Sequence, residues 1–410
     1  MYRYLEKCAN CIKLKRRVSS ASYGYLNLNV NDKVVRYFED LKKNIIYIND
    51  SKECKKYINE IEQNVMNENL KIIGLDIEGY KIGRNGTVSI IQICAKDIYI
   101  FDLYKCDNSY LFAKYLKELF ENKNIIKVTH DCREDCSILF NQYNINLNNI
   151  FDTQIAYNLI LKKSKKELYQ ISYDDLLYKC LFLNNNHKIY FHKIISLDNK
   201  IYLKRPISKE LIHYAVQDVL YLKPLMLNLV ETLSNIENGT PRADTEDSEN
   251  DEDSENDENS ENNENSENSE NSENNTNTNY DQNGKDNNLS LDVCKDTQHI
   301  IEKNNNFHFI NYVIEKSQKY IDYQHLNSHI KNEKHLQKGM IIEGMVVSCN
   351  NINLYVKLNL SKRGVIKNFM NNTYEIGDIV KCVILDFCEN DFIKLGLLDS
   401  STLEMTTTTK

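Results

Sequence analysis

The sequence predicts an α/β domain followed, after an acidic tether, by a small all-β barrel. Between about Val35 and Asn235, short Ile-rich runs alternate with segments of helical spacing, which is typical of an α/β domain. Residues 240–290 repeat Ser, Glu and Asn and offer almost nothing to bury, so we expect a disordered linker. Residues 336–398 contain five short strand-like runs spaced by glycines, which favours a barrel.

The α/β domain is expected to start with several neighbouring strands. Apolar runs predict buried strands over Leu70–Ile77, Thr87–Ala95 and Ile98–Leu103, and the short breaks between them predict antiparallel pairing. Helical spacing of apolar residues predicts a helix over Leu111–Phe120, and Ile125–Thr129 predicts a fourth strand.

The composition bears on which partners and which cellular compartment we expect for this protein. The net charge of the 410 residues is −8, but residues 244–273 hold 15 Asp or Glu and no Lys or Arg. The rest of the chain is net basic, so the overall negative charge does not argue against a nucleic-acid partner. No run of about 18 apolar residues occurs, so we expect no membrane partner. Twelve cysteines without a framework indicate reduced thiols in an intracellular protein, cytoplasmic or nuclear.

The remaining segments are assigned by composition. Residues 1–34 form a basic leader that reads as an ordinary basic arm, with mitochondrial or other organellar targeting as the alternative. Residues 291–335 are expected to be a partly helical connector, with one amphipathic helix over Phe309–Tyr323. Residues 399–410 are predicted to be a disordered tail.

Acidic residues occur at three suggestive places in the α/β domain. Asp76 and Glu78 alternate along the first predicted strand, so both carboxylates project from one face. Asp135 opens a helix after the fourth strand, and Tyr214 and Asp218 share one face of a later helix. A neighbouring Lys or Arg is the plainer partner for an isolated Asp-x-Glu pair. Four converging carboxylates instead require divalent cations, and oxygen ligands select Mg²⁺ or Mn²⁺.

These segments resemble a known family. GLDIEGY, KVTHDCREDCSILF with FDTQIAY, and RPISKELIHYAVQDVLYL resemble the DEDDy 3′–5′ exonucleases of the DnaQ-like, RNase H-like superfamily, with RNase D and EXD1/Egalitarian-type domains nearest. The resemblance covers about residues 35–235 and implies an RNase H-like mixed sheet with flanking helices. It also implies that two Mg²⁺ ions, or Mn²⁺, are bound and that Tyr214 orients the attacking water, so that nucleoside monophosphates leave the 3′ end. The metal ligands that it implies are Asp76, Glu78, Asp135 and Asp218.

Other polar residues near these positions are weaker candidates. Gln92 on the second strand and His130 beside the acids are expected to support the site rather than react. Asp131 either joins a hydrogen-bond network beside the acids or is an ordinary polar residue at a strand end. Asp152 precedes an apolar helix and is predicted to be its N-cap.

The predicted barrel, 336–398, resembles an S1 domain, the RNA-binding module with the OB fold. The resemblance rests on its glycine spacing, the LYVKL strand and the Gly377-Asp378 step. It implies single-stranded RNA with a free 3′ end as the partner, with Tyr355 stacking on a base and Lys367 and Lys394 as further RNA contacts. A barrel that contacts protein is the alternative.

Together these observations predict a two-metal-dependent 3′–5′ exonuclease that acts on single-stranded RNA. Two alternatives remain open: a non-catalytic RNA-binding adaptor of the EXD1 type, and a DNA-directed, proofreading-like 3′–5′ exonuclease.

Overall fold

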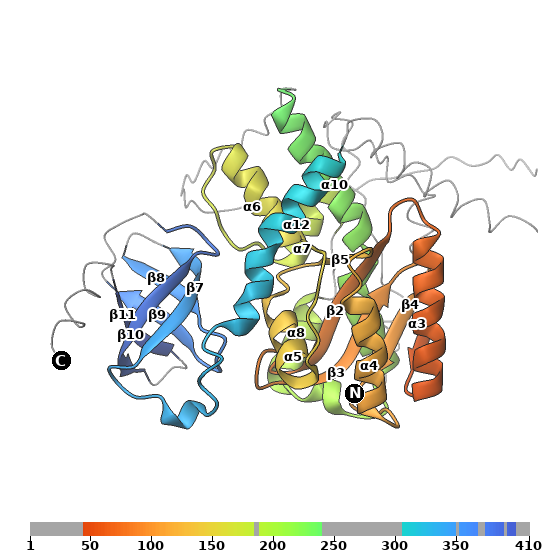
Figure 1. The fold of residues 1–410 in the computed structure, drawn as a ribbon, viewed down its shortest axis with the longest axis horizontal. Helices are drawn as coiled ribbons and strands as arrows, with labels where there is room; N and C mark the ends of the chain where they lie inside the picture. Colours follow the sequence, from red (N-terminus) through yellow and green to blue (C-terminus); the bar gives the residue numbers. More distant parts are fainter. Residues whose placement is uncertain are drawn as a thin grey trace, which may run out of the picture.

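Two folded parts, an α/β part and a small barrel, make up the described chain (Figure 1). The computed structural model describes residues 44–183, 188–239, 306–349, 352–367, 374–388 and 392–398. The predicted leader at 1–34, the acidic linker at 240–290 and the tail at 399–410 lie outside these residues.

A six-stranded mixed sheet forms the centre of the α/β part. Its strand order is β1-β4-β3-β2-β5-β6. The predicted antiparallel pairing of the early strands is confirmed, because β3 pairs antiparallel with both β2 and β4, whereas β1, β5 and β6 join in parallel. The strands are β1 (Ile45–Ile48), β2 (Ile72–Tyr80), β3 (Thr87–Cys94), β4 (Ile98–Asp102), β5 (Ile126–Thr129) and β6 (Ile150–Asp152).

Helices flank this sheet. Several begin at a side chain that accepts backbone N–H groups: Asp50 caps α3, and Ser208 caps α9. Asp152 caps α6 as predicted, accepting from the backbone N–H groups of Gln154 and Ile155. The helices are α3 (Ser51–Met66), α4 (Ser109–Phe120), α5 (Arg133–Tyr143), α6 (Thr153–Lys163), α7 (Tyr173–Leu181), α8 (Lys188–Leu197), the 3-10 helix η1 (Ile201–Leu203), α9 (Lys209–Leu220) and α10 (Leu222–Glu237).

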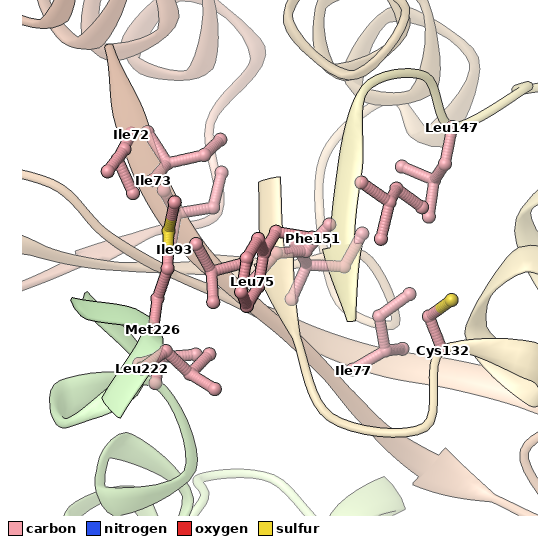
Figure 2. Close-up of a cluster of buried hydrophobic side chains, with 14 of the residues drawn as sticks. Ile72, Ile73, Leu75, Ile77, Ile93, Cys132, Leu147, Phe151, Leu222 and Met226 are labelled. Atoms are coloured by element: carbon pink, nitrogen blue, oxygen red, sulfur yellow. The ribbon is translucent and has the colours of Figure 1, made fainter. Parts of the chain in front are cut away.

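The middle strand β2 is held by its apolar side chains. Figure 2 shows Leu75 and Ile77 among buried apolar side chains that include Ile93 of β3, the partner of Leu75 in the sheet. Because strand residues alternate between faces, Asp76 and Glu78 point to the side of the sheet opposite to Leu75 and Ile77. Burial of the apolar face therefore sets the direction of the acids of β2.

Helix α12 (Phe307–Asp322) joins the barrel to the sheet and confirms the amphipathic helix predicted there. It runs between the barrel and the α/β part (Figure 1). The Ser317 hydroxyl accepts a hydrogen bond from the backbone N–H of Asp152 at 3.1 Å. Val313 and Tyr320 of α12 lie in the same buried core as the sheet, and so does Met345 of the barrel. The short 3-10 helices η2 (Tyr323–His325) and η3 (Glu333–His335) follow.

The C-terminal residues form a closed five-stranded barrel, as the sequence predicts. Its strand order is β10-β11-β9-β8-β7, and β7 and β10 close the ring. The β9–β11 pair is parallel, and the other pairs are antiparallel. The strands are β7 (Ile341–Cys349), β8 (Asn353–Lys357), β9 (Arg363–Lys367), β10 (Ile379–Phe387) and β11 (Phe392–Leu397). Across the described ranges, no helix has the length and apolar character that crossing a membrane requires.

Candidate active site

Strand β2 and helix α9 bring three acids together. Asp76 and Glu78 lie on the face of β2 opposite to Leu75 and Ile77, and each offers a carboxylate oxygen within 4.8 Å of the other and of a carboxylate oxygen of Asp218 on α9. The convergence predicted for these three residues is therefore present in the fold.

A glycine allows α9 to come this close. Gly74 precedes Asp76 by two residues and points to the same face of β2. A Cβ atom at this position would lie 2.8 Å from the carbonyl oxygen of Val219, next to Asp218. The missing side chain therefore sets the short distance between the strand and the helix that supply the acids.

The fourth predicted acid, Asp135, lies in the first turn of α5 and is only 8% exposed. It is not one of the three residues whose oxygens lie within 4.8 Å of one another. The pKa of Asp135 is raised first by burial and then by the charges of Asp76, Asp131 and Glu78, so its carboxylate interacts electrostatically with this cluster.

The electrostatics of the cluster favour a bound cation. Burial raises the pKa of Asp76 to about 7, and burial together with the Asp76 charge raises the pKa of Glu78 to about 8. Within the described residues, no Lys or Arg forms an ion pair with Asp76, Glu78 or Asp135. The donor set consists of oxygens, which suits a hard divalent cation such as Mg²⁺ or Mn²⁺. A bound cation would stabilise the charged carboxylates, which burial disfavours.

Tyr214 lies one helical turn before Asp218 on α9 and is 7% exposed. Its ring stacks on that of Phe191 from α8, with 4.4 Å between centroids. Burial, followed by the charge of Asp218, raises the pKa of Tyr214, so the phenol is neutral near pH 7 and its hydroxyl can donate or accept a hydrogen bond.

Two further tyrosines next to the acids were not predicted from the sequence. The pKa of Tyr202 on η1 is raised by burial and by the charge of Glu78, and that of Tyr173 on α7 by burial and by the charge of Asp218. The Arg205 guanidinium, which forms a salt bridge with Asp102, holds the Tyr202 backbone by donating from Nη1 to its carbonyl oxygen at 2.7 Å. Arg205 and Pro206, which begin the segment RPISKELIHYAVQDVLYL, were the sequence signal near Tyr202, but they did not indicate that this side chain lies beside the acids.

Three weaker candidates lie around the cluster. Gln92 is buried directly opposite Asp76 in the β2–β3 register, and its amide atoms have no hydrogen-bond partner within the described chain. The His130 ring lies within hydrogen-bond distance of the Thr153 hydroxyl at 2.9 Å and the Ile171 carbonyl at 3.1 Å. Asp131 forms a two-bond ion pair with Arg133.

Asp152 has more than the capping role predicted from sequence. Its carboxylate also accepts from the backbone N–H groups of Asp131, at 3.2 Å, and Cys132, at 2.8 Å. One buried side chain thus holds both the start of α6 and the turn that leads to Asp135.

The barrel carries aromatic and basic side chains on one outer face. Tyr355, Val365 and Lys394 lie side by side on β8, β9 and β11, and Lys357, Arg363 and Phe392 form the next row. Lys367 ends β9 on the same face, opposite Asn353.

A cavity of about 370 Å³ opens on this face. Tyr355, Arg363 and Phe392 of the barrel line it together with Tyr169 and Gln170 of the α/β part. The rings of Tyr355 and Phe392 meet edge to face, with 6.3 Å between centroids. Of the three barrel residues predicted from sequence, only Tyr355 lines the cavity, whereas Arg363 and Phe392 were missed.

The site thus consists of carboxylates from β2 and α9, within a mixed sheet that has flanking helices. Residues 45–234 match a family described as 3′–5′ exonuclease. The match covers slightly less than half of the chain and ends before α12 and the barrel.

Particular curated proteins are similar to parts of the chain. An Egalitarian protein homolog of Caenorhabditis elegans is 30% identical over 32% of this chain and 24% of its own length. The piRNA biogenesis protein EXD1 of Homo sapiens is 28% identical over 40% of this chain and 33% of its own length. The chain therefore spans only about a quarter to a third of these curated relatives.

Solved structures are similar over slightly less than half of the chain. RNase D of Trypanosoma brucei has 18% sequence identity and a TM-score of 0.38 over 47% of this chain and 71% of its own. Escherichia coli RNase D has 17% identity and a TM-score of 0.38 over 46% and 45%, respectively.

Proposed function

We propose that this protein is a divalent-cation-dependent 3′–5′ exonuclease that releases nucleoside monophosphates from single-stranded RNA. The observation that carries the proposal is the cluster of Asp76, Glu78 and Asp218, whose carboxylate oxygens lie within 4.8 Å of one another inside a 3′–5′ exonuclease domain. Asp135, buried nearby, is the fourth ligand that we assign.

Each residue of the site has a role in this proposal. The four carboxylates hold two Mg²⁺ or Mn²⁺ ions, which when bound supply Lewis-acid activation of water and neutralise charge on the leaving oxygen. The neutral hydroxyl of Tyr214 orients the attacking water toward the terminal phosphorus, and the ring of Phe191 holds the tyrosine ring in place. Tyr202 and Tyr173 exclude bulk water from the acids.

The barrel supports RNA as the substrate. Five strands in a closed ring, with the third and fifth strands parallel, agree with the OB fold that we assign to an S1-like domain. Aromatic rings beside an arginine on its outer face suit the stacking of bases and the binding of phosphates. EXD1 relatives carry the name piRNA biogenesis protein, which agrees with an RNA substrate.

The test uses matched RNA and DNA oligonucleotides of identical sequence, with Mg²⁺ or Mn²⁺, and measures released mononucleotides. Asp76→Ala removes a ligand and should abolish release, whereas Asp386→Ala, a change to an exposed barrel aspartate, should not. Binding of RNA without turnover in both metals would contradict the proposal and indicate the adaptor. Faster release from DNA would contradict the RNA assignment and indicate a DNA-directed enzyme.

A further inference from the structure

The barrel contacts the helix turn that carries Asp135. Lys357 of β8 places its Nζ 3.0 Å from a carboxylate oxygen of Glu134 and 3.9 Å from one of Asp131. The Tyr323 hydroxyl, in η2, donates to Glu134 at 3.1 Å. Both of these partners of Glu134, the residue next to Asp135, therefore come from the chain that follows the matched exonuclease segment.

This contact neutralises charge where acids accumulate. Three acids, Asp131, Glu134 and Asp135, lie within five consecutive residues where the chain enters α5. The fully buried Arg133 guanidinium pairs with Asp131. The Lys357 ammonium lies opposite Glu134, and their side chains are 17% and 31% exposed, so solvent screens the pair only in part.

Buried hydrogen bonds fix the geometry of the same contact. The Tyr323 hydroxyl that donates to Glu134 also accepts from the backbone N–H of Asn359 at 2.9 Å. The Asn359 side chain meets the Ser137 hydroxyl of α5. Since Tyr323, Asn359 and Ser137 are all buried, a shift of β8 moves the first turn of α5.

A second ion pair between the two parts provides a contrast. Lys162 of α6 lies 2.6 Å from a carboxylate oxygen of Glu375, before β10. Both side chains are more than half exposed, and neither residue belongs to α5. This pair joins the same two parts of the chain without touching the turn that carries Asp135.

We propose that Lys357, together with Tyr323, is a positioning residue of the exonuclease site: by holding Glu134 it fixes the α5 turn that presents Asp135 to the bound cations. The barrel is then an integral part of the nuclease as well as a surface for RNA. This inference rests on the proposed function, because it assigns Asp135 as a metal ligand.

The experiment compares Lys357→Met, Lys357→Arg and Lys162→Met in the full chain. Isothermal titration calorimetry measures Mn²⁺ affinity, steady-state kinetics measure kcat and KM on single-stranded RNA, and thermal melts check folding. We expect Lys357→Met to weaken Mn²⁺ binding and lower kcat by about 10-fold each, the lower end for groups that orient metal ligands. KM should stay unchanged, Lys357→Arg should restore most of the loss, and Lys162→Met should behave as wild type.

Several results would overturn this proposal. A salt-dependent rise in KM with unchanged Mn²⁺ affinity would mean that Lys357 contacts the RNA instead. Equal losses of Mn²⁺ affinity and kcat in Lys357→Met and Lys162→Met would mean that any contact between the barrel and the α/β part has this effect, and not the contact with Glu134 in particular. Tyr323→Phe, which keeps the ring but removes the hydroxyl donor, should also weaken Mn²⁺ binding, and wild-type affinity there would contradict the network.

The Mn²⁺ titration separates this inference from the proposed function. A wild-type protein that binds Mn²⁺ at Asp76 but degrades no nucleic acid would contradict the proposed activity. The role of Lys357 would still be tested there by the Mn²⁺ affinity of Lys357→Met. A wild-type protein whose Mn²⁺ binding equals that of Asp76→Ala would overturn both.

Discussion

Substituting Gly74 with alanine tests whether close packing of α9 on β2 builds the acidic cluster. The added Cβ would meet the Val219 carbonyl oxygen at 2.8 Å, about 0.6 Å short of the 3.4 Å at which ordinary contact begins. The clash involves backbone, so no side-chain rotation relieves it, and α9 must move away from β2. Asp218 is adjacent to Val219 and must move with it.

The expected loss of stability is moderate. Overpacking a tight core costs about 1–3 kcal/mol, and the smaller conformational freedom of the unfolded alanine chain returns about 0.4–1 kcal/mol. The net loss of about 1–2 kcal/mol should lower Tm by about 2–8 °C. Thermal melts of the full chain measure this change.

The expected loss of function is larger. Ligand distances in a metal site tolerate about 0.2 Å, so a shift of about 0.6 Å at Asp218 should weaken Mn²⁺ binding and lower kcat by about 10-fold or more. Gly396→Ala in β11 is the matched control, because its Cβ would meet side-chain atoms of Val383 and Leu385 at 3.2 and 3.4 Å. A folded Gly74→Ala protein with wild-type Mn²⁺ affinity and kcat would refute the reasoning.

Three further predictions concern charge and stacking. Burial raises the pKa of Asp76 to about 7 and that of Glu78 to about 8, so the cation-free folded chain keeps protons that the unfolded chain releases near pH 4. The stability of the cation-free protein should therefore fall as pH rises from about 5 to 8. The increase in Tm on adding Mn²⁺ should grow over the same pH range. Arg133→Met should lower the free energy of unfolding, measured in urea, by about 3 kcal/mol, because it removes the buried partner of Asp131. Tyr355→Ala should weaken RNA binding by about 1–3 kcal/mol, seen as a higher KM at constant kcat.

Each of these has a control and a contrary outcome. A Tm gain from Mn²⁺ that is flat between pH 5 and 8 would contradict the raised pKa values of the carboxylates. Adding Asp131→Asn to Arg133→Met should recover part of the loss, and no recovery would mean that packing rather than charge is the cause. Tyr110→Ala, at an exposed tyrosine of α4, should leave KM unchanged, and an equal rise in both tyrosine variants would contradict a role of the cavity.

Local patterns predicted much of the architecture. Period-two alternation placed Asp76 and Glu78 on one face of β2, and the i, i+4 spacing placed Tyr214 and Asp218 on one face of α9. The five runs of the C-terminal segment became five strands because short apolar runs between glycines have few other ways to bury one face. Asp152 became a helix cap as its position before an apolar helix predicted.

Local patterns could not predict the contacts between segments that are far apart in the sequence. Tyr202 and Tyr173 lie beside the acids because η1 and α7 fold back over the sheet, and no periodicity in the chain records that arrangement. Arg363 and Phe392 meet Tyr355 through the parallel β9–β11 pairing, which joins strands separated by β10.

The sequence by itself determined which residues alternate, which start helices and which acids face the same side of an element, because those properties depend on residues a few positions apart. Only the tertiary structure decided that α9 approaches β2 at Gly74 and that Lys357 of the barrel meets Glu134 of α5. The physical reason is that such contacts depend on how whole elements pack, and the free energy of that packing is shared among many residues far apart along the chain.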